Sequence, residues 1–182
     1  MPIFTTESPG SCPGADWLSY GSYCYRVERI PRSYGEAKFD CSTKGSLRDR
    51  MCLKYFIISN FSKIGSNVVS LASKAEMEFV KNNVDSKPVI FEIWIGLERD
   101  TASGLFYLHK NINFLKNFYN HLFMIFKGLY IWDDGTALQF NGFAHNNHSE
   151  TCVYMYNNIW YDSECFLTKR VYVCKRLKSE LY

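Results

Sequence analysis

Cysteine is the residue type whose spacing in this chain most clearly indicates chemistry, because two thiols in an oxidising environment join as a disulfide. The 182-residue sequence contains seven cysteines, and six of them lie near its two ends: Cys12, Cys24, Cys41, Cys152, Cys165 and Cys174. Cys12 with Cys24, and Cys152 with Cys165, are close enough in sequence to close local loops. Cys41 with Cys174 would join the front of the domain to its last strand. Six cysteines allow fifteen pairings, so this arrangement is a hypothesis.

Disulfides persist in oxidising compartments, so we predict a secreted, extracellular protein. Residues 1–6 have neither the basic nor the apolar stretch of a signal peptide. We therefore expect that a leader is missing from this version of the chain, and export by another route is the alternative. No apolar stretch is long enough to cross a bilayer, which predicts that no segment spans a membrane.

The other reactive side chains do not form a catalytic set. Asp133 and Asp134 precede a glycine at a predicted turn, where acidic side chains form hydrogen bonds with the backbone. His145 and His148 stand three apart, as zinc ligands sometimes do, but no cysteine or carboxylate follows at a defined third spacing. Six cysteines committed to disulfides leave no thiol nucleophile in the domain proper, so we predict that the protein is not an enzyme. An enzyme that uses the two histidines and Glu150 is the alternative.

Two capping boxes predict the helices. In Ser33 with Glu36, and in Ser73 with Glu76, each side chain can satisfy a free amide at a helix start. The first helix is expected to extend to about residue 44, and the second to stop near residues 81–83. Helical spacing predicts the side chains that face the core: Ala37 and Cys41 in the first helix, and Ala75, Phe79 and Val80 in the second.

Short apolar runs between turn residues predict the strands. A hairpin is expected within residues 12–30, turning at Gly21-Ser22, and further strands are expected at 93–97, 130–132, 152–156, 159–161 and 170–175. Two helices with many short antiparallel strands indicate an α+β domain.

The chain resembles a C-type lectin-like domain over nearly its whole length, from Cys12 to Arg176. Four groups of residues carry the resemblance by their order and spacing: Trp94-Ile95-Gly96-Leu97, which matches the family's WIGL strand; Tyr34-Gly35-Glu36-Ala37 ahead of Cys41; Val69 to Ser73 followed by Glu76 and Phe79; and Cys152, Trp160, Asp162, Cys165 and Cys174, which match the block around the WND motif. The resemblance implies the long form of the fold, with the pairs Cys41–Cys174, Cys152–Cys165 and Cys12–Cys24. It places the domain at 12–176, between tails at 1–11 and 177–182.

Two inserts, residues 47–66 and 106–129, do not belong to the family pattern. Each ends by repeating the residues before it: Gly65-Ser66 repeats Gly45-Ser46, and Gly128-Leu129 repeats Gly104-Leu105. The second insert consists mostly of residue types with codons rich in A and T. We hypothesise that both inserts are translated non-coding sequence, and genuine surface loops are the alternative.

The inserts also account for the unpaired Cys52 and for the charge of the chain. The first holds four basic residues against one acidic residue, and the second holds three basic residues and none that is acidic. Without them the net charge of +3 becomes negative, so the mild basicity does not predict nucleic-acid binding. Polar and aromatic residues surround the helical wheel of the second insert, which argues against an amphipathic membrane helix.

The resemblance also implies where a ligand would bind. In this family a sugar binds through a calcium ion held by oxygens of a long loop and the adjacent strand, and calcium prefers six to eight oxygen ligands. Glu150 and Asp162 match that pattern. The proline-containing triplet that should precede them is absent, since residues 143–147 read Phe-Ala-His-Asn-Asn, and Tyr161 replaces the asparagine of WND.

We therefore expect a degenerate site with weak or no calcium binding. The predicted ligand-binding residues are Asn146, Asn147, Glu150, Trp160 and Asp162, of which Glu150, Asp162 and Asn146 are the candidate calcium ligands. Trp160 would stack on a sugar ring, or belong to the core. Asn60 and Asn147 begin acceptor sequences for N-glycosylation, and a glycan on Asn147 would obstruct the binding loop.

The sequence thus predicts a secreted carbohydrate-binding module of the C-type lectin-like fold with a degenerate calcium site. Its expected partners are glycans or glycoproteins, and neither nucleic acid nor a membrane. The alternative is a calcium-independent module on the same fold that binds a protein or another ligand.

Overall fold

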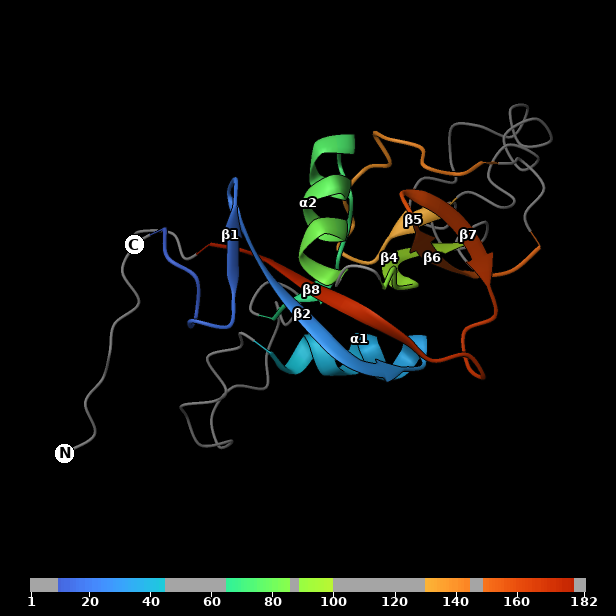
Figure 1. Ribbon diagram of the computed structural model, residues 1–182, viewed down its shortest axis with the longest axis horizontal. Helices are drawn as coiled ribbons and strands as arrows, with labels where there is room; N and C mark the ends of the chain where they lie inside the picture. The colour runs from blue at the N-terminus through green and yellow to red at the C-terminus, as the bar shows by residue number, and fades with distance from the viewer. Residues whose placement is uncertain (1–9, 45–64, 86–88, 100–129, 145–148, 179–182) are drawn as a thin grey trace, which may run out of the picture.

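The computed structural model describes residues 10–44, 65–85, 89–99, 130–144 and 149–178, and Figure 1 shows their arrangement. In chain order its elements are β1 (Leu18–Tyr20), β2 (Tyr23–Arg32), α1 (Tyr34–Thr43), β3 (Asn67–Val68), α2 (Lys74–Val84), β4 (Ile93–Arg99), β5 (Tyr130–Trp132), β6 (Cys152–Tyr156), β7 (Ile159–Ser163) and β8 (Arg170–Leu177). The predicted α+β organisation is confirmed.

Several predictions fall outside the described residues. They concern most of the insert 47–66, all of the insert 106–129, most of both tails, and the residues Cys52, Asn60, His145, Asn146, Asn147 and His148. No helix in the described ranges is long and apolar enough to cross a membrane.

The strands form one sheet in the order β1-β2-β8-β4-β6-β7, with β3 beside β8 and β5 beside β4. Neighbouring strands run antiparallel, except that β4 and β8 are parallel. Figure 1 shows α1 and α2 on opposite sides of the long β2–β8 ribbon. The sheet therefore has a helix, and a core, on each side.

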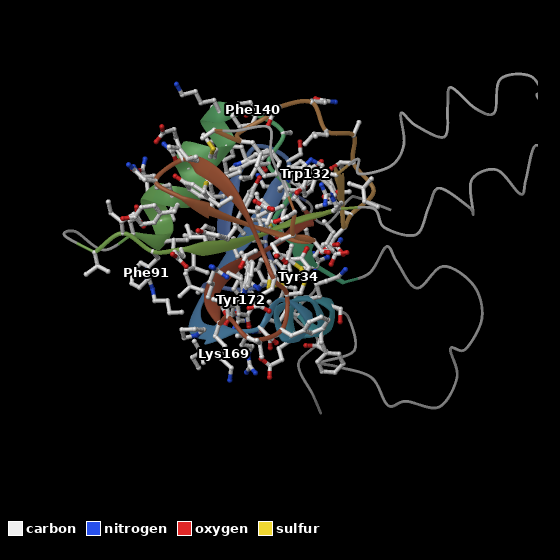
Figure 2. The ribbon with its side chains drawn as sticks, turned by 90° about the vertical axis from the view of Figure 1, so that its right-hand side faces the viewer. Tyr34, Phe91, Trp132, Phe140, Lys169 and Tyr172 are labelled. Carbon is white, nitrogen blue, oxygen red and sulfur yellow. A yellow bond between two sulfur atoms is a disulfide. The ribbon has the colours of Figure 1, made fainter. Side chains whose placement is uncertain are left out.

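Each helix buries one face in its own core. Met77, Val80 and Val84 of α2 pack in the larger core with Trp132. Tyr34, Ala37 and Cys41 of α1 pack in the smaller core with Trp94 and Tyr172. Figure 2 shows Trp132 and Phe140 above the sheet, toward α2, and Tyr34 and Tyr172 below it, beside α1.

Both predicted helix starts are confirmed. The Ser33 N–H donates to Glu36 Oε2 at 2.9 Å, and the Glu76 N–H donates to Ser73 Oγ at 3.1 Å. These bonds satisfy amides that have no partner inside the helix. The helix starts are therefore determined by residues that are close together in the sequence.

The inward face of α2 was partly mispredicted. Ala75 is exposed and Phe79 half-buried, whereas Val80 is buried as expected. The buried positions are Glu76, Met77, Val80 and Val84, so the buried face is rotated by one residue from the predicted one. The helix also continues to Val84, past the predicted stop, because that side chain is fully buried.

The three expected disulfides are present. Cys12–Cys24, Cys41–Cys174 and Cys152–Cys165 have Cα–Cα distances of 5.6, 5.3 and 5.4 Å. Cys41–Cys174 joins α1 to β8 across 133 residues of sequence. In the chain-entropy account, a loop of this length stabilises the folded state by roughly 5 kcal/mol.

One close backbone approach and one tight turn shape the sheet. A Cβ on Gly96 would lie 2.4 Å from the carbonyl oxygen of Val68, so only glycine lets β3 pass this closely over β4. Asn157 and Asn158 have φ of 48° and 65°, the two positive values that a tight hairpin turn requires. They connect β6 to β7 where the sequence predicted a turn.

Candidate functional site

Glu150 and Asp162, the two carboxylates predicted at the ligand site, lie next to each other in space. Asp162 is on β7, paired with Val153 of β6, and Glu150 is just before β6. Asp162 Oδ2 accepts the N–H of Ser149 at 2.7 Å and the N–H of Glu150 at 2.8 Å. The Asp162 carboxylate therefore holds the chain that leads into β6.

Arg99, at the end of β4, extends this hydrogen-bonded region. Its N–H donates to the Thr151 carbonyl at 2.8 Å, and its Nη1 donates to the Ser149 carbonyl at 3.3 Å. The guanidinium also lies 6.0 Å from the ring centre of Tyr130. The positively charged Arg99 side chain is therefore hydrogen-bonded to Ser149, and the N–H of Ser149 donates in turn to Asp162.

Tyr130 completes the group on the neighbouring strand β5. Its hydroxyl donates to the Glu150 carbonyl at 3.4 Å. Burial, with the charge of Asp162, raises the pKa of Tyr130 to about 12. The phenol is therefore neutral at physiological pH and acts as a hydrogen-bond donor. We call Arg99, Tyr130, Ser149, Glu150 and Asp162 the strand-end site.

The described part of the strand-end site does not fit a calcium ion. Calcium requires six to eight oxygen ligands, and only two carboxylates are present here. One oxygen of Asp162 already accepts two amides, and Arg99 brings a competing positive charge. Among the described residues, no group of three or more His, Cys, Asp and Glu side chains could hold a metal.

Trp160, predicted as a ligand-binding or a core residue, has the surroundings of a core residue. Its side chain is 1% exposed. The rings of Trp132, Phe140 and Phe143 meet it edge to face at 5.5, 5.4 and 5.7 Å. A Cβ on Gly142 would come within 2.5 Å of its ring. The indole therefore has no face open to a ligand, and it supports the chain at 140–143.

The two aspartates after β5 have different roles. Asp134 Oδ1 accepts the Thr136 N–H at 2.9 Å. As predicted, this carboxylate stabilises the backbone of a turn. Asp133 differs from the prediction, because it accepts the Tyr34 hydroxyl at 2.9 Å and pairs with Lys38 at 2.9 Å. These partners come from α1, which sequence spacing does not place beside β5.

Arg99, Tyr130 and Ser149 are site residues that the sequence patterns did not indicate, and Arg99 is the charged one. It lies two positions beyond the WIGL motif, in a strand predicted to end at residue 97. The signal that would have found it is the register between β4 and β6, because Glu98 lies opposite Cys152. That register contains a shift between Ile95 and Glu98, which no local pattern indicates.

Comparisons with known proteins agree with this geometry. The model of the family described as "Lectin C-type domain" matches residues 62–176. The C-type lectin lectoxin-Lio1 of Erythrolamprus poecilogyrus is 23% identical over 180 residues, which cover 94% of this chain and 83% of that protein.

Two solved structures show the same fold. The C-type lectin CEL-I from Cucumaria echinata has a TM-score of 0.62 at 20% identity, covering 90% of this chain and 96% of its own. A calcium-independent type II antifreeze protein has a TM-score of 0.61 at 17% identity, covering 95% and 99%. The predicted C-type lectin-like fold is confirmed.

Proposed function

The chain belongs to the family of lectin C-type domains, and on that premise we propose that it is a non-catalytic extracellular recognition module that binds glycans without calcium at the strand-end site. Three disulfides suit an oxidising compartment, which supports an extracellular location. The proposal keeps the ligand class predicted from the sequence.

The observation that carries this proposal is the network of protein hydrogen bonds around Asp162. Asp162 is satisfied by two backbone amides, and Arg99 supplies the positive charge beside it. These hydrogen bonds hold the chain that enters β6. Glu150 is exposed at the same place, and its carboxylate is an acceptor for sugar hydroxyls.

Calorimetric titration with glycans chosen from an array tests this proposal. We expect a chelator to leave the glycan affinity unchanged. We also expect calcium to leave the melting temperature unchanged, because only a ligand that binds the folded state raises the melting temperature. Arg99→Gln should weaken glycan binding about tenfold, the effect of losing a charged hydrogen bond.

Arg29→Gln is the matched control. The Arg29 guanidinium also donates to a backbone carbonyl, that of Val84 at 2.7 Å, but it joins β2 to α2 instead of lying at the strand-end site. It should leave glycan affinity unchanged. Binding that disappears with chelator and returns with calcium would contradict the proposal.

A second candidate function is calcium-independent binding of a protein ligand, and the connection between β7 and β8 favours it. Phe166 and Leu167 are 80% and 88% exposed. Glu164 accepts both of their amides at 2.7 Å and that of Thr168 at 2.6 Å. The Thr168 hydroxyl also donates to Glu164 Oε1, at 2.5 Å, and this bond, followed by those from the amides, lowers the pKa of Glu164 to about 2.

The loop thus displays two apolar side chains in a fixed conformation, as a protein-binding surface does. Phe166→Ser with Leu167→Ser separates the two functions. If the ligand is a protein, this double variant loses binding to cell-surface extracts while glycan affinity is unaffected. Equal binding by the variant and the native chain would remove this candidate.

We also propose that the binding domain is continuous without the two inserts. Support comes from described residues at the edges of the two inserts, including Ser66, the last residue of the first insert. Ser66 Oγ donates to the Cys41 carbonyl at 2.6 Å, so the chain resumes at the end of α1, where it left. Arg99 and Tyr130 are opposite each other in the β4–β5 pair. The described chain on either side of each insert therefore lies close together in space.

A further inference from the structure

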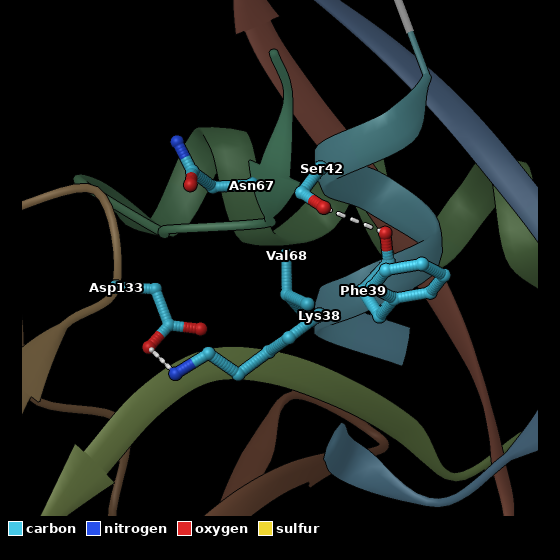
Figure 3. A pocket seen from close by; sticks show the side chains of 6 residues that line it. All are labelled: Lys38, Phe39, Ser42, Asn67, Val68 and Asp133. Atoms are coloured by element: carbon cyan, nitrogen blue, oxygen red, sulfur yellow. Dashed lines mark hydrogen bonds and ion pairs between the residues drawn. The ribbon is translucent and has the colours of Figure 1, made fainter. Parts of the chain in front are cut away.

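We propose that a recess between α1, β3 and the turn after β5 binds a single neutral sugar ring, separately from the strand-end site. The ligand class rests on the proposed function, whereas the location does not. The recess is lined by Lys38, Phe39, Ser42, Asn67, Val68 and Asp133, and its volume is about 270 Å³ (Figure 3). Pockets for drug-sized ligands begin at about 300 Å³, so this one suits a ligand as small as one sugar ring.

Phe39 provides the apolar wall. Its side chain is 73% exposed, although α1 buries Tyr34, Ala37 and Cys41 on its other face. Figure 3 shows the ring beside the recess, on the same helix as Ser42. An aromatic ring is a flat apolar surface with a negative face, which suits the C–H groups on one face of a sugar. Phe39 therefore offers a stacking surface that Trp160 does not.

Asn67 and Ser42 provide neutral hydrogen-bonding groups on two sides of the recess. The Asn67 side chain makes no hydrogen bond to another described residue, and it is half-buried. Ser42 Oγ donates to the Phe39 carbonyl at 2.7 Å and keeps its lone pairs for accepting. An amide and a hydroxyl together donate and accept, as the hydroxyls of a sugar do.

The charges at the floor select against an acidic ligand. Lys38 Nζ pairs with Asp133 Oδ1 at 2.9 Å and with Glu98 Oε1 at 3.0 Å. Tyr34 donates to the other oxygen of Asp133 at 2.9 Å. One ammonium thus faces two carboxylates, and the local charge is negative. Acidic sugars are repelled, whereas a neutral ring can accept the third N–H of Lys38, which donates to neither carboxylate.

Titration of the isotope-labelled full chain with methyl hexosides, followed by NMR, tests this proposal. We expect neutral hexosides to shift the amide resonances of residues 38–42 and 67–68, with or without chelator, and N-acetylneuraminic acid to leave them unchanged. Phe39→Ser should weaken the binding about tenfold. Its melting temperature should not change, because the ring is exposed.

Phe166→Ser is the matched control, since Phe166 is also an exposed phenylalanine, 80% exposed, and does not line the recess. It should leave hexoside affinity unchanged. Arg99→Gln should weaken the strand-end site and leave the shifts at the recess intact, so failure of one proposal is distinguishable from failure of the other. Unshifted resonances at the recess, equal effects of the two phenylalanine variants, or tighter binding of the acidic sugar would each overturn the inference.

Discussion

Two clusters built from a lysine, a carboxylate and a tyrosine lie on opposite sides of the sheet and differ in their contact with water. The α2 cluster consists of Lys175, Glu76 and Tyr25. Lys175 Nζ lies 2.6 Å from Glu76 Oε1, to which the Tyr25 hydroxyl also donates at 2.5 Å. The lysine and glutamate side chains are only 5% and 7% exposed.

The α2 cluster has a partner for each charged oxygen and for the ammonium. Glu76 Oε2 accepts the Ala72 N–H at 2.8 Å. Lys175 Nζ also donates to the Ser70 carbonyl at 2.9 Å. Buried charges are tolerated when they are paired and hydrogen-bonded in this way. The cluster fastens β8 to α2 and β2.

The α1 cluster consists of Lys38, Asp133 and Tyr34, with Glu98 beside it. Its lysine is 41% exposed and lines the recess. Burial, and then the charge of Glu98, raise the pKa of Asp133 above its usual value. The same side-chain types are therefore buried away from water on one side of the sheet and accessible to water and ligands on the other. Burial, and not residue type, separates a structural ion pair from one that a ligand can reach.

Lys175→Met should have the largest effect on stability. It leaves the Glu76 carboxylate buried without its counter-charge, which costs about 3–5 kcal/mol of the free energy of unfolding. Chemical denaturation measures the loss. Adding Glu76→Gln should restore part of it, because the amide keeps an acceptor for Tyr25 without a charge. A single-variant loss below about 1 kcal/mol would show that the α2 cluster is not sealed.

Alkaline pH should destabilise the protein through both clusters. Burial, with Glu76 or Asp133 nearby, raises the pKa of Tyr25 and of Tyr34 in the folded state. Their contribution is complete below the unfolded pKa of about 10 and is lost as pH rises above it, by up to about 1.4 kcal/mol per tyrosine per pH unit.

Urea denaturation between pH 8 and pH 11 measures this loss. Tyr25→Phe and Tyr34→Phe should each flatten the decline, because phenylalanine does not ionise. Stability curves of the same slope in the native chain and in both variants would contradict the assignment.

Lys38→Met should cost about 1 kcal/mol, several times less than Lys175→Met, because water reaches this ammonium and screens its pairing. The same denaturation experiment gives the value. Equal losses from the two lysine variants would erase the distinction between the clusters.

Deleting residues 47–66 or 106–129 should have the smallest effect. The described chain on either side of each insert already lies close together, because Ser66, the last residue of the first insert, bonds to Cys41, and Arg99 pairs with Tyr130. We expect both shortened proteins to melt within a few degrees of the full chain and to keep the recess. Failure of either to fold, or a mature transcript with protein detected across both segments, would show that the inserts are genuine parts of the domain.

Local signals predicted the elements that depend on neighbouring residues. The capping boxes at Ser33 and Ser73 located both helix starts, since each bond joins residues three apart. The predicted turn at Asn157-Asn158 also formed, because asparagine tolerates positive φ. The resemblance located the disulfides, including Cys41–Cys174.

Features that depend on distant segments escaped prediction. Strand β3 exists because Asn67 and Val68 pair with Lys175 and Cys174, more than a hundred residues later. Arg99 reaches Ser149 across a register shift. Ala75 was placed inward from spacing alone, whereas the contacts of α2 with the sheet decide which of its faces is covered.

The sequence by itself determined the α+β class, most of its elements with their caps and turns, and the family pattern, since these follow from interactions over a few residues or from motif order. Only the tertiary structure decided that Lys175 is sealed while Lys38 is open, and that Trp160 is enclosed while Phe39 is exposed. The physical reason is that burial depends on which segments, distant in sequence, pack over a side chain, and burial determines how strongly water weakens its charge or competes for its surface.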